Sequence, residues 1–275
     1  MNRPVPAPRW GISGYYALAD LPQRGSLSEL VLSTGWAEFD PIFRPYPGQF
    51  VVVTGKPGSG KSTFVFNLLA QMSWKHKHKH WLYVPENEPA IMDKLELIYG
   101  TNKQLFGQFA HTQCFIQSSG DEHYDAEPRT IEWVLSMAWA AWERDQINTV
   151  VVDPWNELDE ARGRNESESD YIGRCLRLVK RFGRETGCTM IVVCHPTKVE
   201  NNREVTLSDC HGSAHWWNRC DAGIIVSREV GRDDAKIIVP KIREQPVAGR
   251  PGHCIFRVDP TTGMFTEQQG GGVVF

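Results

Sequence analysis

The sequence contains no long apolar run. Its 275 residues never approach the roughly 18 consecutive apolar residues of a membrane-spanning helix, so we expect no such helix. The first residues, MNRPVPAPRWG, lack the apolar core of a secretory signal. Positive charge is not in excess either, because 30 Lys and Arg face 33 Asp and Glu, a formal net charge of −3. This excludes a generally basic protein that coats nucleic acid, but not a local basic channel.

Paired cysteines are also missing. The chain has seven cysteines but no CxxC pair, which argues against a zinc ribbon and favours reduced thiols in a cytoplasmic protein. What is abundant is core-forming material, because 41% of residues are hydrophobic and 11% are aromatic. The sequence therefore predicts a folded domain with a large core.

Punctuation by Pro, Gly and Ser divides the chain. Residues 1–34 are rich in these residues and predict an arm or linker, and residues 35–275 predict the domain itself. Apolar runs bounded by turn residues then alternate with helical periodicity, which is typical of a parallel sheet covered on both faces. The expected strands are 49–55, 80–86, 113–118, 148–154 and 188–196, and the expected helices are 61–75, 88–99, 129–145 and 168–187.

After Asp221 the rhythm changes to three apolar runs with no helix between them, at 222–229, 235–243 and 253–259. These runs predict an antiparallel extension at one edge of the sheet. The fold class is therefore α/β, a doubly wound and mainly parallel sheet with an antiparallel C-terminal extension.

The strongest motif is GKPGSGKS, an unbroken match to the phosphate loop pattern G-x-x-x-x-G-K-[ST]. It follows an apolar strand and opens a helix, as the motif requires. Backbone N–H groups of such a loop surround phosphates, the lysine adds a point charge, and the hydroxyl reaches Mg²⁺. We expect ATP or another nucleoside triphosphate to contact Gly55, Pro57, Gly58, Ser59, Gly60, Lys61, Ser62 and Thr63.

Two carboxylates end predicted strands beside this loop. Asp153 closes TVVVD, where it could hold Mg²⁺ together with Ser62. Glu86, in LYVPENE, could orient and deprotonate an attacking water. Glu88 is the alternative, although it could simply stabilise the start of the next helix.

His195 ends another strand at the same edge. It could sense the γ-phosphate, or it could be a core or cap histidine, and the sequence leaves both interpretations open. The long polar segment 196–220 follows, and long loops in compact domains are usually functional or disordered. Its basic residues include Lys198 and Arg203, which suggests a contact with nucleic acid. Trp216 and Trp217 are the aromatic residues that could stack on bases there.

Two further groups of charged residues are open to more than one interpretation. Lys241 and Arg243 alternate with Ile242, so both should lie on one face and could bind a phosphate, even one held by a neighbouring subunit. The alternative is a solvated edge strand. The run KHKHKH at 75–80 could bind a metal, or could place cations at the end of a helix.

Together these motifs resemble the RecA-fold helicase domain of the DnaB superfamily, in the Twinkle and phage primase-helicase branch. The similarity covers roughly residues 35–265 and rests on GWxxFD, GKPGSGKST, VPENE, VVVDPWNE, VVCHPTK, LSDCHGSAHWWNRCD and KIR. No primase domain precedes residue 35 in this sequence, so primer synthesis is not implied.

The resemblance implies roles for individual residues. Lys61, Ser62 and Asp153 match the phosphate and Mg²⁺ ligands, and Glu86 matches the catalytic glutamate. Other residues match a γ-phosphate sensor (His195), an arginine finger acting on the neighbour's ATP (Arg243), a second cation acting in trans (Lys241), an adenine contact (Arg228) and DNA-binding loops that include Lys198, Arg203, Gly212 and Ser213.

The function that this resemblance implies is a ring-forming, ATP-dependent replicative helicase that moves on single-stranded DNA. The expected partners are further copies of the chain, as a hexamer, with primase and replicative polymerase, in a bacterial or phage-infected cell and without a membrane. Two alternatives stay open. One is a RecA-like loader or recombination mediator that binds DNA without unwinding it, and the other is a kinase built on a phosphate loop, which should need no arginine in trans.

Overall fold

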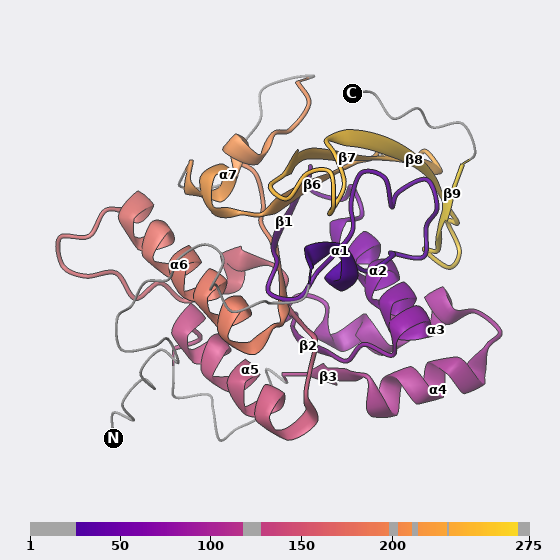
Figure 1. Ribbon diagram of the computed structural model, residues 1–275, viewed down its shortest axis with the longest axis horizontal. Helices are drawn as coiled ribbons and strands as arrows, with labels where there is room; N and C mark the ends of the chain where they lie inside the picture. Colours follow the sequence, from indigo (N-terminus) through magenta and orange to yellow (C-terminus); the bar gives the residue numbers. More distant parts are fainter. Residues whose placement is uncertain (1–25, 118–127, 198–202, 211–213, 230, 269–275) are drawn as a thin grey trace.

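The computed structural model describes residues 26–117, 128–197, 203–210, 214–229 and 231–268 (Figure 1). Its strands form one nine-stranded sheet in the order β3-β2-β4-β5-β1-β6-β7-β8-β9. The strands are β1 (Phe50–Thr54), β2 (His80–Tyr83), β3 (Cys114–Ile116), β4 (Thr149–Val152), β5 (Thr189–Val193), β6 (Ala222–Ser227), β7 (Asp234–Ile242), β8 (Gly252–Val258) and β9 (Phe265–Glu267).

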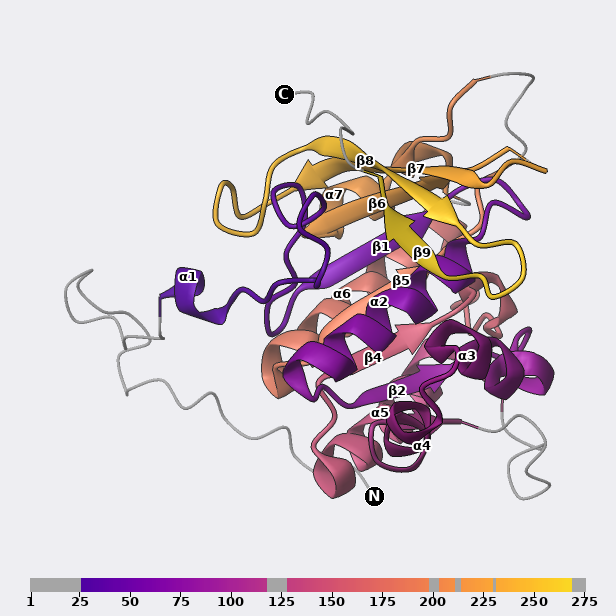
Figure 2. The same ribbon diagram turned by 90° about the vertical axis from the view of Figure 1, so that its right-hand side faces the viewer.

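The mainly parallel sheet with an antiparallel C-terminal extension is confirmed, but the run 222–229, predicted as the first strand of the extension, forms β6 and pairs in parallel with β1. Strands β3, β2, β4, β5, β1 and β6 pair in parallel, whereas β7, β8 and β9 pair antiparallel. Figure 2 shows the sheet running from β8 and β9 at the top to β2 near the bottom. The short strand β9 was not predicted. Strand β1 lies inside the sheet between β5 and β6, so the loop that follows it emerges between two neighbouring strands.

Helices cover both faces of the sheet. They are α1 (Leu27–Leu30), α2 (Lys61–His76), α3 (Ile91–Tyr99), α4 (Lys103–Thr112), α5 (Ile131–Asp145), α6 (Glu168–Thr186) and α7 (His215–Arg219), with the 3₁₀ turns η2 (Glu88–Ala90), η3 (Trp155–Glu157) and η4 (Leu207–Asp209). The four predicted helices are present, with 88–99 divided into η2 and α3, and α4 is an additional helix. No described helix is long and apolar enough to span a membrane.

Side-chain alternation along β1 separates two cores. Val51 and Val53 face α2 to α4 and join one cluster, while Phe50 and Val52 join a second cluster with α5 and α6. All five residues of β1 are buried, because successive side chains of a central strand enter opposite cores. This double burial explains why the strand sequence is continuously apolar.

Local signals define the ends of the helices. The Thr130 and Ser167 side chains accept hydrogen bonds from the N–H groups of Trp133 and Asp170, which satisfies donors in the first turns of α5 and α6. Helix α6 ends at Gly187, whose φ of 77° is a left-handed conformation that glycine adopts without steric cost.

The predicted arm contributes to the core at its end. Thr34 is fully buried, and Val31 and Leu32 pack against the first core cluster. Residues 1–25 of the arm lie outside the described residues. The division between arm and domain at residue 35 stays a prediction. Residues 31–34, which were assigned to the arm, pack against the domain.

One pair of cysteines contradicts the expectation of reduced thiols. Cys194 and Cys210 form a disulfide with a Cα–Cα distance of 6.1 Å, whereas the other cysteines are free. Cys194 follows β5, and an isolated bridge between Pro196 and Cys210 brings the two backbones together. No CxxC spacing signals this pair, because the chain returns to β5 only after a long polar segment.

The β8–β9 turn contacts the helix that follows the phosphate loop. Asn67 of α2 donates to the carbonyl of Gly263 (3.0 Å) and accepts from the N–H of Phe265 (3.0 Å). The Phe265 ring packs on Phe64 of α2, with ring centroids 5.5 Å apart. A segment near the end of the described chain thus supports an element near its start.

Candidate nucleotide-binding and catalytic site

The loop 55–60 has a backbone that requires glycine. Gly55 has a φ of 152°, and a Cβ atom there would lie 2.2 Å from the carbonyl oxygen of Val226 in the adjacent strand β6. Gly60 precedes α2 with a φ of 90°, in the left-handed region. The loop therefore curls tightly between β1 and α2, where N–H groups at a helix start favour phosphate.

Lys61 points back into this loop. Its Nζ atom donates to the carbonyls of Gly55 (3.1 Å) and Lys56 (3.2 Å), and the residue is 5% exposed. Burial lowers the pKa of Lys61, while Asp153 and Glu86 act in the opposite direction. The ammonium thus lies where a phosphate could replace its carbonyl partners.

Asp153 follows β4 and lies against the start of α2. It is 2% exposed, and burial raises its pKa to about 6, opposed by a hydrogen bond with Ser62 and the charge of Lys61. One of its carboxylate oxygens, Oδ2, is buried without a hydrogen-bond partner. An orphaned carboxylate oxygen beside a serine hydroxyl is the donor set that Mg²⁺ prefers, so these two residues fit the expected metal.

The two glutamates that follow β2 act on different groups. Glu86 is exposed three residues past β2, and its charge acts on Lys61, Asp153 and His195. Glu88 begins η2 instead, and its charge acts on Tyr83. This arrangement favours Glu86 as the base, although its role stays a prediction.

His195 lies two residues past β5 beside the same centre. Burial lowers its pKa, Lys61 lowers it further, and Glu86 opposes both effects. The imidazole is therefore favoured in its neutral form near neutral pH. Its backbone N–H donates to Asn156 Oδ1 at 3.2 Å, so a side chain of η3 fixes the position of this turn.

A groove adjoins the outer side of the loop. Lys56 and Pro57 line it together with Arg228, just past the end of β6, and its volume is about 620 Å³. Arg228 Nε donates to the carbonyl of Arg232 at 2.7 Å. Inside the loop, Ser59 is 1% exposed and its hydroxyl has no partner. Arg228 thus lines the same groove as Lys56 and Pro57 of the loop, and its contact with adenine stays a prediction.

Asn87 was not identified from sequence. It is 8% exposed between the two glutamates, its amide donates to the Ser62 hydroxyl at 3.4 Å, and Lys94 donates to its side-chain oxygen. Its position directly after Glu86, at the end of a strand leading to this edge, is the signal that could have identified it.

Lys241 and Arg243 lie at the opposite edge of the sheet. Ile242 pairs with Ala222, the first residue of β6, and β6 runs parallel to β1, whose far end carries the phosphate loop. These cations therefore cannot act on the nucleotide of their own chain. Both approach the segment around α7, where Lys241 bonds to the carbonyl of Trp217.

A buried acid, Asp221, lies beside these two cations. Arg243 Nε pairs with Asp221 Oδ1 at 2.8 Å, and Lys180 pairs with the same oxygen at 2.6 Å. Asp221 immediately precedes β6, so antiparallel pairing with the end of β7 brings it to Arg243. Sequence separation conceals this contact.

The predicted DNA-binding segment is described only in part. Lys198, Gly212 and Ser213 lie outside the described residues. Arg203 pairs with Asp209 through both terminal nitrogens, at 2.6 and 3.0 Å, so its charge is partly neutralised.

Neither tryptophan of α7 offers a free face in the way the sequence suggested. Trp216 is 0% exposed and packs on Trp155, which removes it as a base-stacking residue because its hydrophobic side chain completes the core. Trp217 is 36% exposed, and Lys241 lies over its ring at 5.7 Å.

The histidine run does not form a metal centre. His80 is fully buried, bonds to Ser73 and Leu69, and has a pKa lowered by burial to about 3. Among the residues that the structure describes, no group of three or more His, Cys, Asp or Glu could hold a metal ion. Mg²⁺ would instead depend on Asp153, Ser62 and the nucleotide.

The phosphate loop lies between the buried strand β1 and helix α2. Asp153 follows β4, and β5 separates β4 from β1 in the sheet. This arrangement defines a RecA-like ATPase domain. The chain belongs to the AAA domain family, whose model matches residues 42–201. The resemblance to a helicase domain of the DnaB type is confirmed by the similar proteins.

Among curated proteins, the chain is 32% identical to the chloroplastic/mitochondrial Twinkle homolog of Arabidopsis thaliana, over 87% of this chain and 37% of that protein. It is 24% identical to the DNA helicase/primase of Enterobacteria phage T3, over 74% of this chain and 40% of that protein. The chain thus spans about two fifths of the length of these relatives.

A solved structure shows the same fold. A DnaB-like replicative helicase, whose structure also describes its interactions with primase, superimposes with a TM-score of 0.68 at 16% identity. The match covers 86% of this chain and 62% of that one. At this identity the likeness concerns the fold alone.

Proposed function

We propose that the chain is the motor domain of a ring-forming replicative DNA helicase that hydrolyses ATP between subunits and moves along single-stranded DNA. The observation that carries this proposal is the division of charged groups between two edges of one sheet. Lys61, Asp153, Glu86 and His195 gather at one edge, and Arg243 lies at the other.

Hydrolysis would begin with the triphosphate against the loop 55–60, with Lys61 donating to its terminal phosphates in place of the Gly55 and Lys56 carbonyls. Mg²⁺, held by Ser62 and Asp153 when bound, would neutralise phosphate charge. Glu86 would accept a proton from the attacking water, since it is exposed beside the site. Neutral His195 would hydrogen-bond to the γ-phosphate without adding charge.

The remaining charge in the transition state needs a further cation. Arg243 carries a permanent positive charge on a planar fork suited to phosphate oxygens, and Lys241 lies beside it. Because neither reaches the phosphate loop of its own chain, they would act on the neighbour's nucleotide. Each active site would then consist of two subunits, with Arg243 supplied in trans.

Movement on DNA would follow from the segment after His195. His195, which would contact the γ-phosphate, directly precedes the segment 196–220. The Cys194–Cys210 disulfide joins the residue before His195 to Cys210 within this segment. A change in phosphate occupancy would therefore act on the chain that carries Lys198 and Arg203.

The direct test compares Lys61→Ala with the unaltered protein. ATP turnover should be lost with and without single-stranded DNA, while the far-ultraviolet circular dichroism stays the same. Lys75→Ala is the matched control, because Lys75 is an exposed lysine in the last turn of α2, at the opposite end of this helix from the phosphate loop. Normal turnover by Lys61→Ala would refute the assignment of the site.

The helicase and its alternatives differ in their response to DNA. A helicase should hydrolyse ATP faster with single-stranded DNA and separate a forked duplex. A loader or recombination mediator would show stimulation without strand separation. A kinase would show neither, and would transfer phosphate to an acceptor other than water.

A further inference from the structure

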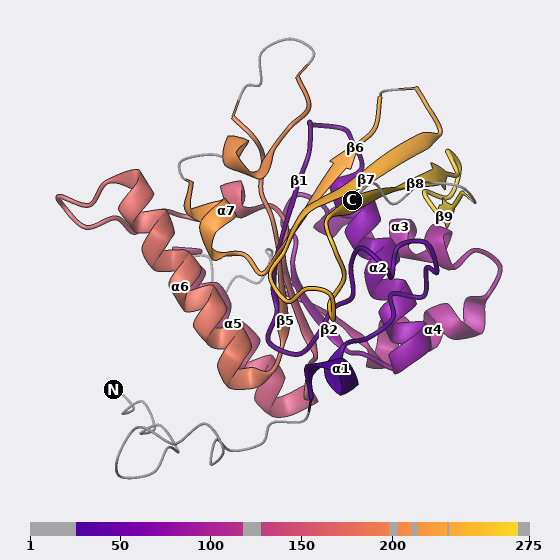
Figure 3. The same ribbon diagram turned by 45° about the horizontal axis from the view of Figure 1, so that its top comes forward.

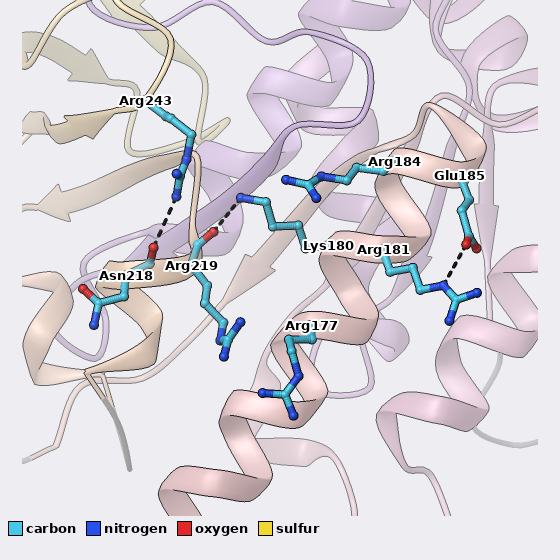
Figure 4. Close-up of a pocket in the computed structure, with 8 residues that line it drawn as sticks. All are labelled: Arg177, Lys180, Arg181, Arg184, Glu185, Asn218, Arg219 and Arg243. Carbon is cyan, nitrogen blue, oxygen red and sulfur yellow. Dashed lines mark hydrogen bonds and ion pairs between the residues drawn. The ribbon is translucent and has the colours of Figure 1, made fainter. Parts of the chain in front are cut away.

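A concentration of positive charge lies outside the nucleotide site. A groove of about 550 Å³, here called the basic groove, runs between α6 and the segment around α7 (Figure 4). Its cations are Arg177, Lys180, Arg181, Arg184, Arg219 and Arg243, against the single acid Glu185. In a chain with a net charge of −3, this is a local reversal of sign.

Half of these cations have no acidic partner in the part of the chain that the structure describes. Arg181 pairs with Glu185 at 2.7 Å, and Asp221 holds Lys180 and Arg243. Within the described residues, no ion pair involves Arg177, Arg184 or Arg219.

The side chain of Arg219 adds a second observation. Its Nε atom is buried without a hydrogen-bond partner within the described residues, and burial together with the positive charge of Arg177 lowers the pKa of Arg219. Like charges held together and a buried donor left unused are costly, and a negative group in the groove would relieve both.

An acidic surface of matching character lies on α3. Asp93 and Glu96 are exposed and have no ion pair within the described residues. They flank Met92 and Leu97, whose side chains are 54% and 46% exposed. Large apolar side chains exposed beside charged ones are typical of protein interfaces. We call these four residues the acidic face of α3.

The basic groove and the acidic face lie on opposite sides of the molecule. In Figure 3, α6 and α7 lie on the left, and α3 lies on the right. Two surfaces at opposite ends of one chain cannot pair within that chain. They can pair head to tail between copies, and repetition of such a contact gives a ring or a filament.

We propose that the basic groove of one copy receives the acidic face of α3 from a second copy. The inference rests on the proposed function at one point, because Arg243 borders the groove and Glu86 precedes α3 by a few residues. A contact that brings Arg243 to the neighbour's nucleotide therefore also brings the groove to the neighbour's α3.

The test is the oligomer mass in the presence of a non-hydrolysable ATP analogue, measured by light scattering across a concentration series. Arg177→Glu with Arg184→Glu should weaken association at least about tenfold, since like charges would then face each other. Asp93→Arg with Glu96→Arg should do the same. Arg144→Glu with Arg257→Glu, two exposed arginines outside the groove, is the matched control and should assemble normally.

Combining both pairs of reversals in one chain should restore assembly, because the acidic side chains introduced at positions 177 and 184 then face the basic side chains introduced at positions 93 and 96 of the neighbouring copy. This rescue also shows that the separate variants are folded. Failure of the rescue would overturn the proposal, as would a monomeric unaltered protein. Unchanged mass with reduced binding of single-stranded DNA would overturn it in favour of a nucleic-acid groove. The readout needs no hydrolysis, so it is independent of whether Arg243 acts catalytically.

Discussion

The two edges of the sheet differ in how completely one chain builds them. At the edge where β1, β4 and β5 end, the groups complement one another: Lys61 lies near Asp153, and Asp153 bonds to Ser62. At the other edge, positive groups gather around a single buried acid, Asp221. At the first edge the opposite charges belong to the chain itself, whereas at the second edge Arg177, Arg184 and Arg219 have no ion pair within the described residues.

The two edges differ in how firmly the fold positions their charged groups. Strand ends of a parallel sheet are fixed by two cores, so the groups of the first edge are held by the fold itself. The cations of the second edge lie on α6, α7 and the end of β7, where side chains are longer and more exposed. Asp221 positions Arg243 within the chain, whereas the proposed role of Arg243 requires the nucleotide of a neighbouring subunit.

The largest expected effect breaks the second edge. Arg243→Ala should lower ATP turnover by about 10³ to 10⁵, because a trans guanidinium stabilises the charge of the transition state. Mixing Arg243→Ala with Glu86→Gln subunits should recover part of the activity, since some junctions join an intact Glu86 to an intact Arg243. Mixed oligomers without recovered activity would show that the arginine does not act in trans.

A somewhat smaller effect is expected at the first edge. Glu86→Gln keeps the size of the side chain and removes the base, so turnover should fall by about 10² to 10⁴ while nucleotide binding is retained. Single-turnover hydrolysis and fluorescent-nucleotide binding separate the two. Glu88→Gln is the matched control, and if it has the larger effect, the base is Glu88.

The pH dependence of the free energy of unfolding should show that ionised Asp153 is destabilising when no metal ion is bound. The pKa of Asp153 is raised from 3.8 to about 6, so without metal its stabilising contribution is present below pH 4 and is lost as the pH rises through 6. In EDTA, Asp153→Asn should therefore gain about 3 kcal/mol relative to the unaltered protein between pH 4 and 7.5. Denaturant melts of both proteins measure this, and a difference independent of pH would contradict the assigned pKa.

The smallest effect concerns the polar segment. Arg203→Ala should weaken binding of single-stranded DNA by less than about tenfold, because Asp209 already neutralises part of its charge, and should reduce the salt slope by at most about 0.7. Lys198→Ala is the companion variant in the same segment, and Lys103→Ala, on α4, is the control. Unchanged affinity for both loop variants would place the DNA elsewhere.

The order of elements was predictable where burial acts on a continuous stretch. Strands such as β1 are apolar throughout because they enter two cores, and the glycine spacing of the phosphate loop is imposed by its backbone. Glu86, Asp153 and His195 could be placed at one edge because parallel strands end together. Their catalytic roles stay predictions.

Other features depend on contacts that no local pattern records. Helix α4 contains Gly107 and few apolar residues, and it is held by tertiary packing of Phe106 and Phe109 on Tyr99. The pairing of Asp221 with Arg243 and the disulfide between Cys194 and Cys210 likewise join positions that are distant along the chain. Such contacts exist only once the sheet is assembled.

The Asn67 contact bears on how this domain can be shortened or fused. A chain that stops before Gly263 would lose both hydrogen bonds to Asn67 and the Phe265 ring beside Phe64, leaving the helix behind the phosphate loop unsupported on that side. Deletion from the carboxyl end should therefore impair nucleotide binding through the loss of this support for α2. Tags and fusion partners are better attached after β9 than in place of it.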